Sequence, residues 1–294
     1  MQVPKAERVV GNLLLAASLL TIFALILIIA TLVYESLFFF SKVSVFEFLF
    51  GLEWTVLFLD KKFGVIPLVA GTFLTSAVAM LLASSIGLGS AIYLSEYASP
   101  RIRAVVKPLL EILAGIPTVV YGYFAIYTIT PLLKSTIFPD IGFYNALSAG
   151  IAMGVMIIPT VASLSEDALY AVPETIKHAA YSLGARKIQV VFRIVVPAAL
   201  SGIVASFILG LARAVGETMI VAIAAGFRPV LTLNPLEAIQ TMTAFIAQVA
   251  TGEAPHGTVE YQSIFAVGLY LFVIVMVLNL IGNYVVRRWG VRIA

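Results

Sequence analysis

Two residues of opposite charge stand inside one long apolar stretch of this 294-residue chain. Arg213 and Glu217 are four positions apart, so on a continuous helix they would face one side, about one turn from each other. A charge at the bilayer centre costs about 2.5–3.5 kcal/mol on insertion scales, and such residues usually face a pathway or a partner. Arginine stays charged and donates two parallel hydrogen bonds, which suits an oxyanion. We therefore expect Arg213, Glu217 and the adjoining Thr218 to border a substrate pathway.

A purely structural interpretation of the same pair is that the two charges neutralise each other and lock the helices together. Buried ion pairs are seldom favourable on balance, so stabilisation alone is a weak reason to keep one. Glu217 would also repel a doubly charged anion. We expect it either to hold Arg213 in position or to accept a proton from the transported anion.

The composition requires a membrane or a large partner to cover apolar surface. Hydrophobic residues make up 61% of the chain and charged residues 11%, whereas a soluble domain is about one quarter charged. This argues against a disordered chain and a free cytosolic enzyme. Cysteine is absent and the two histidines, His178 and His256, are far apart, which argues against thiolate or histidine metal sites. Since no GxxxxGK[ST] phosphate loop occurs, any ATP that drives this protein is hydrolysed by a partner.

Hydrophobic windows long enough to cross a bilayer occur six times. A hydrocarbon core about 30 Å thick needs about 20 helical residues. The windows cover residues 11–33, 67–94, 108–133, 143–164, 198–226 and 264–286. The tails and even-numbered loops carry twelve basic residues and the opposite loops five, which places both termini in the cytoplasm. We predict an all-α integral membrane protein with six transmembrane helices.

Small residues recur every fourth position along the fifth window. Gly202, Ser206 and Gly210 begin this row, and a shorter pair, Gly150 and Gly154, occurs in the fourth window. Small residues at this spacing allow helices to approach closely in lipid. We expect the fifth helix to be packed along this row and to present its charges on the adjacent side.

Two longer loops are predicted on the external side. The first, residues 34–66, contains a Phe- and Leu-rich stretch that is too polar to cross the membrane and is expected at its interface. In the second, Asn234, Pro235 and Glu237 suit the first turn of a helix. Apolar residues then follow on one face through Val249. This predicted amphipathic helix either lies at the interface or closes a pathway.

The cytoplasmic loop of residues 165–197 is patterned as two helices. Pro173 and Glu174 suit the start of a helix, and Gly184 suits its end. A second helix is predicted over residues 187–196, leading into Pro197. The first helix carries an apolar or small stripe at helical spacing, made of Ile176, Ala179, Ala180 and Leu183. This face either packs on the protein's own helix ends or docks into a cytoplasmic partner.

Here the sequence resembles a known family. His178-Ala179-Ala180, three residues, Gly184, nine residues, Ile194, one residue and Val196-Pro197 are similar in spacing to the EAA loop of ABC importer permeases. Two positions depart from that pattern, because His178 replaces Glu and Val196 replaces Leu. The resemblance implies the type I importer permease (MetI-like) fold. It also implies that His178, Ala179, Ala180 and Gly184 belong to a coupling helix held in a groove of an ATPase subunit.

Further stretches resemble the phosphate importer permeases within that family. Residues 213–219, Arg-Ala-Val-Gly-Glu-Thr-Met, are similar to their RAxGET motif. Residues 63–67, 94–98, 113–122, 234–235 and 241–244 are similar to other parts of the same proteins. Met219 and the AGIPTVVYG run favour the PstC branch over its sister branch, PstA, which stays an alternative.

This resemblance implies one half of a membrane heterodimer, completed by a PstA-like permease. Two PstB-like ATPases would bind the cytoplasmic side together with ATP and Mg²⁺, and a PstS-like protein would deliver phosphate from outside. This chain would then be a non-catalytic subunit in the inner, cytoplasmic membrane, without a cofactor of its own. Residues 1–66 are expected to form an anchor helix and external loop, residues 67–286 the permease domain, and residues 287–294 a basic tail.

Three other classes of function remain open. A permease for sulfate, molybdate or tungstate is the nearest, since only the RAxGET stretch disfavours it. A secondary transporter would more often show two similar halves, and none is evident here. A membrane enzyme would need clustered acids, bases or metal ligands, which this chain does not offer within its apolar windows.

Overall fold

The computed structural model describes residues 5–289, and every regular element in this range is helical. Four helices are long and apolar enough to span a membrane, in the segments Val10–Phe40, Ile66–Tyr97, Ala146–Tyr170 and Val259–Arg287. Two bent helix pairs raise the possible number of spans to six. The predicted all-helical membrane architecture is therefore confirmed, with two of the six spans broken.

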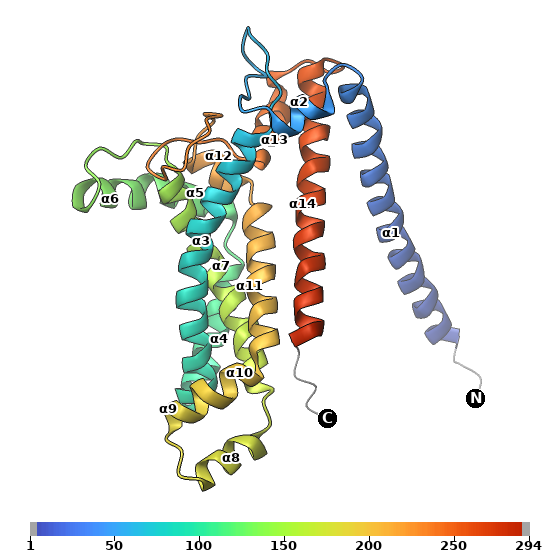
Figure 1. The fold of residues 1–294 in the computed structure, drawn as a ribbon. Helices are drawn as coiled ribbons and strands as arrows, with labels where there is room; N and C mark the ends of the chain where they lie inside the picture. The colour runs from blue at the N-terminus through green and yellow to red at the C-terminus, as the bar shows by residue number, and fades with distance from the viewer. Residues whose placement is uncertain (1–4, 290–294) are drawn as a thin grey trace.

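The chain begins with α1 (Lys5–Phe40), which meets α14 (Val259–Trp289) at one end of the molecule and diverges from it toward the other (Figure 1). The start of α1 and the end of α14 lie at the same end of the bundle. Which end faces the cytoplasm stays a prediction from the basic residues. Of those, the side chains of Lys5, Arg8, Arg288 and Arg292 lie outside the described part of the structure.

The centre of the bundle is built by α3 (Ile66–Ile92) and α7 (Ala146–Tyr170), which pack closely along their length. Glycines allow this approach: a Cβ placed on Gly150 would lie 2.6 Å from the Cβ of Val78. A Cβ on Gly154 would lie 3.0 Å from the carbonyl oxygen of Ala79. These positions are glycine because the facing helix leaves no room for a side chain.

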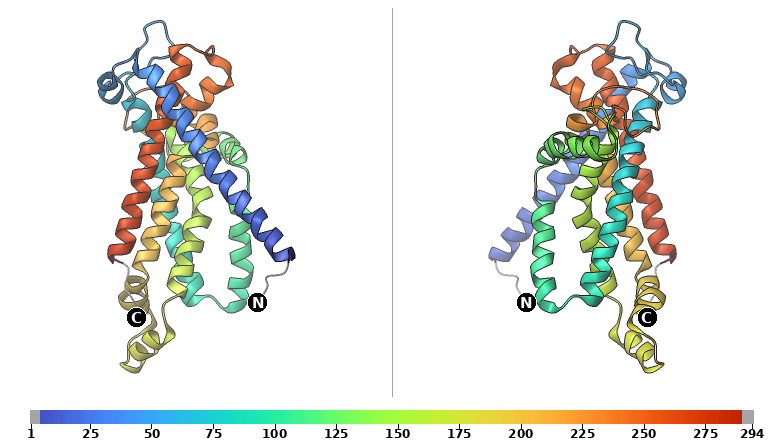
Figure 2. Two further views of the ribbon diagram at one scale, coloured as in Figure 1. Left: turned by 90° about the vertical axis from the view of Figure 1, so that its right-hand side faces the viewer. Right: turned by 90° about the vertical axis from the view of Figure 1, so that its left-hand side faces the viewer.

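The third predicted span is not one helix. It is divided into α4 (Pro100–Ala114) and a run composed of α5 (Thr118–Phe124), the π-helix η2 (Ala125–Ile129) and α6 (Thr130–Thr136), bent by 88°. Pro117 causes the break, since a residue before proline is disfavoured in the helical region and proline lacks the N–H to continue the ladder. As a result α5 and α6 lie across the bundle rather than along it (Figures 1 and 2).

The fifth predicted span, residues 198–226, is also wrong as a continuous helix. The short helices α9 (Lys187–Val190), η3 (Val191–Val195) and α10 (Val196–Ala198) lead into α11 (Leu200–Val215) through a 67° bend. Helix α11 then ends, and α12 (Met219–Ala224) begins after three residues. Gly216, a poor helix former, lies at this break.

Within α11, the residues of the predicted small row face α7. The hydroxyl groups of Ser206 and Ser165 are 2.7 Å apart, and Gly202 lies against Ala168. Gly210 lies against Ile157 and Val161 of α7 and Met80 of α3. The later members of the row, from Thr218 on, lie beyond the end of α11.

At the end of the bundle opposite α8 (Glu174–Ser182), residues 41–65 and 225–258 form a cap (Figure 1). It contains α2 (Val45–Phe50), α13 (Met242–Gln248) and the π-helix η4 (Val249–Glu253). An aromatic cluster fills it, made of Phe39, Phe48, Trp54, Phe63 and Phe245. Phe48 and Trp54 are 1% exposed, so the Phe-rich stretch is partly a protein core and not only an interfacial segment.

The helix predicted to start at Asn234 is displaced. The Asn234 side chain accepts the N–H of Leu236 and donates to Glu237, which closes a turn instead of opening a helix. Helix α13 begins at Met242, and the Thr241 hydroxyl caps it by accepting the N–H of Ala244. The expected apolar face, which includes Ile239, Met242, Phe245 and Val249, is buried within the protein. The interfacial interpretation of this segment is therefore wrong.

Candidate functional site

Arg213 lies where three elements meet. It stands in the last turn of α11, where a cation is favoured by the helix dipole, and it is half-buried. Its Nη1 donates a 3.0 Å hydrogen bond to the Thr160 hydroxyl on α7. Tyr121 of α5 is close enough to feel its charge, and the Tyr121 hydroxyl donates to the carbonyl of Leu113 at 2.9 Å. The guanidinium is thus fixed beside the α4–α5 bend, with further N–H groups left to bind an anion.

Glu217 has a different position from the one expected. Because α11 ends at Val215, Glu217 is not one turn above Arg213 on a shared helix face. Its Oε1 accepts the backbone N–H groups of Met219, at 3.0 Å, and Ile220, at 3.2 Å, and so caps α12. Within residues 5–289 no ion pair joins Glu217 to Arg213, so the proposed neutralising lock is not formed.

The break after α11 is held from the cap side by the start of α13, a contact that was not predicted from the sequence. The Thr243 hydroxyl donates to the backbone carbonyl of Glu217 at 2.6 Å. The N–H of Met242 donates to Thr72 of α3 at 3.1 Å. Thr218 itself is half-buried within the break. Thr72 and Thr160 escaped prediction because an uncharged hydroxyl in an apolar window has no distinguishing pattern. The contact of Thr243 with Glu217 escaped prediction because it joins residues 26 positions apart.

The loop of residues 165–197, predicted to be cytoplasmic, has the expected pair of helices. Helix α8 (Glu174–Ser182) is followed by Gly184, whose φ of +82° favours glycine, and then by α9. Ala180 is 7% exposed and packs on the protein's own core, whereas His178 and Ala179 are exposed and Leu183 is 90% exposed. One face of α8 is therefore seated on the bundle and another is free.

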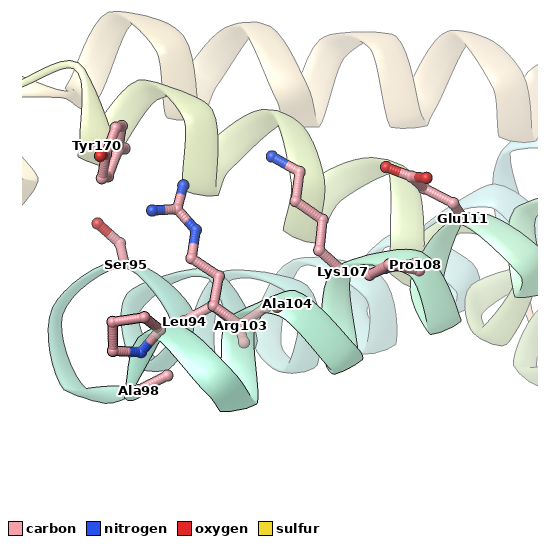
Figure 3. A pocket seen from close by; sticks show the side chains of 10 residues that line it. Leu94, Ser95, Ala98, Arg103, Ala104, Lys107, Pro108, Glu111 and Tyr170 are labelled. Atoms are coloured by element: carbon pink, nitrogen blue, oxygen red, sulfur yellow. The ribbon is translucent and has the colours of Figure 1, made fainter.

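A hollow of about 620 Å³ opens between α4 and α7 at the α8 end (Figure 3). Arg103 and Lys107 extend across it from α4. Arg103 pairs with Glu166 and its guanidinium lies 4.0 Å from the ring centre of Tyr170. Lys107 pairs with Glu166 at 2.9 Å and with Asp167 at 2.7 Å. These ion pairs join α4 to α7. Because both cations are already paired with carboxylates, we do not assign the hollow as a second anion site.

Comparison with known proteins gives a consistent answer. The family described as "Binding-protein-dependent transport system inner membrane component" matches residues 83–291. A probable ABC transporter permease protein, YqgH of Bacillus subtilis, is 34% identical over 249 residues, covering 84% of this chain and 80% of that one. The phosphate transport system permease protein PstC of Mesorhizobium japonicum is 32% identical over 265 residues, with coverage of 84% and 80%.

Solved structures share the fold at lower identity. A bacterial alginate ABC transporter in complex with its periplasmic protein contains a chain that aligns with a TM-score of 0.66 at 16% identity, covering 97% of both chains. The MetNI methionine ABC transporter in an inward-facing conformation aligns with a TM-score of 0.57 at 19% identity, covering 77% of this chain and 94% of that one. The MetI-like architecture expected from the sequence is thereby confirmed.

Proposed function

The chain belongs to the family of binding-protein-dependent transport system inner membrane components, and from this premise we propose that it is a permease subunit of an ATP-driven importer of inorganic phosphate. Phosphate is assigned as the substrate because the chain is similar to PstC phosphate permeases, at 32% identity over more than four fifths of its length. Similar PstC proteins from Xylella fastidiosa and Pasteurella multocida are each 30% identical. The names of these relatives favour the PstC branch over PstA.

We infer that phosphate passes beside Arg213. The guanidinium is anchored by Thr160 through one N–H and retains others, so it is able to donate to a tetrahedral oxyanion without being rebuilt. Glu217 shapes this passage through the backbone: it caps α12 and keeps the non-helical residues 216–218 in place. Broken helices at a transport site are a recurrent device, because they expose backbone groups only where these line a cavity.

The partners follow from the same proposal. A PstA-like permease would complete the membrane heterodimer, and a PstS-like protein would supply phosphate at the cap. Two PstB-like ATPases would bind ATP and Mg²⁺ and hold the free face of α8. Next to that face, exposed apolar side chains lie outside the apolar windows: Leu183 directly after α8, Ile188 in α9 and Phe192 in η3. This chain is then a permease and not an enzyme, and its domains keep the bounds predicted from sequence.

Uptake of radiolabelled phosphate tests the proposal. The chain is produced with the permease, ATPase and binding protein that co-purify with it, and the complex is reconstituted in vesicles. We expect ATP-dependent uptake that arsenate inhibits and sulfate does not. Uptake inhibited by sulfate, molybdate or tungstate would assign another oxyanion, whereas ion-driven uptake without an ATPase would assign a secondary transporter.

A further inference from the structure

The loop of residues 165–197, called the docking loop below, contains a buried lysine that has no role in the transport site. Lys177 lies on the inner face of α8, with its side chain 6% exposed. Its Nζ donates a 2.8 Å hydrogen bond to Oε1 of Glu96, whose side chain is 5% exposed. Lys177 also pairs with Glu174 on its own helix at 3.0 Å, but that carboxylate is 67% exposed. The contact with Glu96 is therefore the one that joins α8 to another element.

Glu96 belongs to the π-helix η1 (Tyr93–Tyr97), which continues α3 to its end. Single turns of π-helix are rare and are frequently found at functional sites. Helix α9, which follows Gly184, also contacts η1, because the Nζ of Lys187 lies 4.8 Å from the ring centre of Tyr97. Residues before and after Gly184 thus both contact η1.

A buried ion pair is a poor choice for stability alone, since desolvation of both charges offsets most of their attraction. Its geometry is well defined, however, because a charge-assisted hydrogen bond is short and directional. Burial would lower the pKa of Lys177, but the hydrogen bonds to Glu96 and Glu174 outweigh this and raise it. Lys177 therefore carries its charge at neutral pH, and its contribution to stability is lost as pH rises through the folded lysine pKa.

Helix α3 connects this contact to the far end of the molecule. Together with η1 it forms one continuous span from Ile66 to Tyr97, and at about 1.5 Å per residue these 32 residues extend over about 48 Å. At its other end Gly71 packs directly against the carbonyl of Gln240, and Thr72 accepts the N–H of Met242. The start of α13, which contacts the backbone of Glu217, therefore packs on the same continuous helix as the docking loop.

We propose that Glu96 and Lys177 are positioning residues that join the ATPase-docking loop to α3, so that displacement of α8 moves α3 and the cap segment resting on it. This inference rests on the proposed function. The pair touches neither substrate nor nucleotide. Its loss should leave the ATPase bound and able to hydrolyse ATP while separating hydrolysis from transport.

The test uses the complete reconstituted complex and measures phosphate uptake and ATP hydrolysis in the same vesicles. Glu96→Gln and Lys177→Gln each break the pair, and Glu174→Gln is the matched control, since it removes the exposed partner of the same lysine. A coupling free energy between sites typically corresponds to a factor of about 5–150, so we expect uptake per ATP to fall by about that factor in the first two variants. Glu174→Gln should match the wild type.

Rescue separates coupling from simple loss of structure. Glu96→Lys and Lys177→Glu are combined in the Glu174→Gln background, so that the new carboxylate does not face Glu174. This reversed pair should restore uptake per ATP toward the control. Normal coupling in both single variants would overturn the inference, as would a reversed pair that restores assembly without restoring coupling. Absence of ATP-driven phosphate uptake in the wild-type complex would instead refute the proposed function.

Discussion

Replacing Glu217 separates the proton-acceptor role predicted from the sequence from the helix-capping role that the structure indicates. In the structure its Oε1 accepts two backbone N–H groups at the start of α12. Glutamine retains an oxygen at this position and can accept both hydrogen bonds, whereas alanine retains none. If capping is the role of Glu217, the alanine variant should therefore be much more damaged than the glutamine variant.

The expected magnitudes follow from these two hydrogen bonds. Loss of a capping side chain costs about 0.5–2 kcal/mol, which we assign to Glu217→Ala. Glu217→Gln loses only the attraction between the carboxylate and the helix N-terminus, about 0.3–1 kcal/mol, and the low end applies because α12 has six residues. For chains of 150–250 residues each kcal/mol corresponds to about 2–4 °C in Tm.

Thermal unfolding of the purified complex and the pH profile of phosphate uptake measure the two roles independently. We expect Glu217→Gln to unfold near the wild-type temperature and to transport with the wild-type pH profile. Glu217→Ala should unfold at a lower temperature and transport more slowly at every pH. A normal Tm combined with an altered pH profile in Glu217→Gln would refute the capping argument and restore the proton-acceptor role.

Substitutions at three further positions, two of them with a matched control glycine, test other parts of the molecule. Arg213→Ala should abolish phosphate uptake while the complex still assembles on size-exclusion chromatography, and Arg213→Lys should restore only part of the uptake; loss of assembly would indicate a structural role instead. Gly184→Arg forces a side chain into a φ of +82°, at a cost of about 1–2 kcal/mol, and should prevent ATPase pull-down. Gly257→Arg, at the same φ but in the cap, is its control and should retain the ATPase. Gly150→Leu should lower Tm, since overpacking costs about 1–3 kcal/mol. Gly89→Leu is the control and should leave Tm unchanged, because the space around Gly89 is open. Equal effects of the two substitutions on Tm would mean that the α3–α7 contact is not close-packed.

Much of the architecture was predictable from the order of residues. Hydrophobic windows located the membrane helices, and Pro173 with Gly184 indicated the extent of α8, because proline and glycine act through backbone geometry that is local in sequence. The row from Gly202 to Gly210 was visible because its spacing matches the helical repeat.

Features that depend on distant contacts were not predictable. The windows that contain Pro117 and Gly216 are hydrophobic enough on average to read as single spans, so hydropathy gave no sign of the two helix breaks. Arg213 was found by its charge, but its anchor Thr160 is 53 positions earlier and carries no local signal. Lys177 looked like one of several solvated loop cations, and only the packing of α8 on η1 shows that it is buried against Glu96.

The most direct test of the account is phosphate uptake by vesicles containing the purified complex of this chain with its permease, ATPase and binding-protein partners. We predict radiolabelled phosphate accumulation that requires ATP, is competed by arsenate, is unaffected by sulfate and is abolished by Arg213→Ala in an assembled complex. Accumulation that proceeds without ATP, or that the Arg213→Ala complex performs at the wild-type rate, would contradict the account.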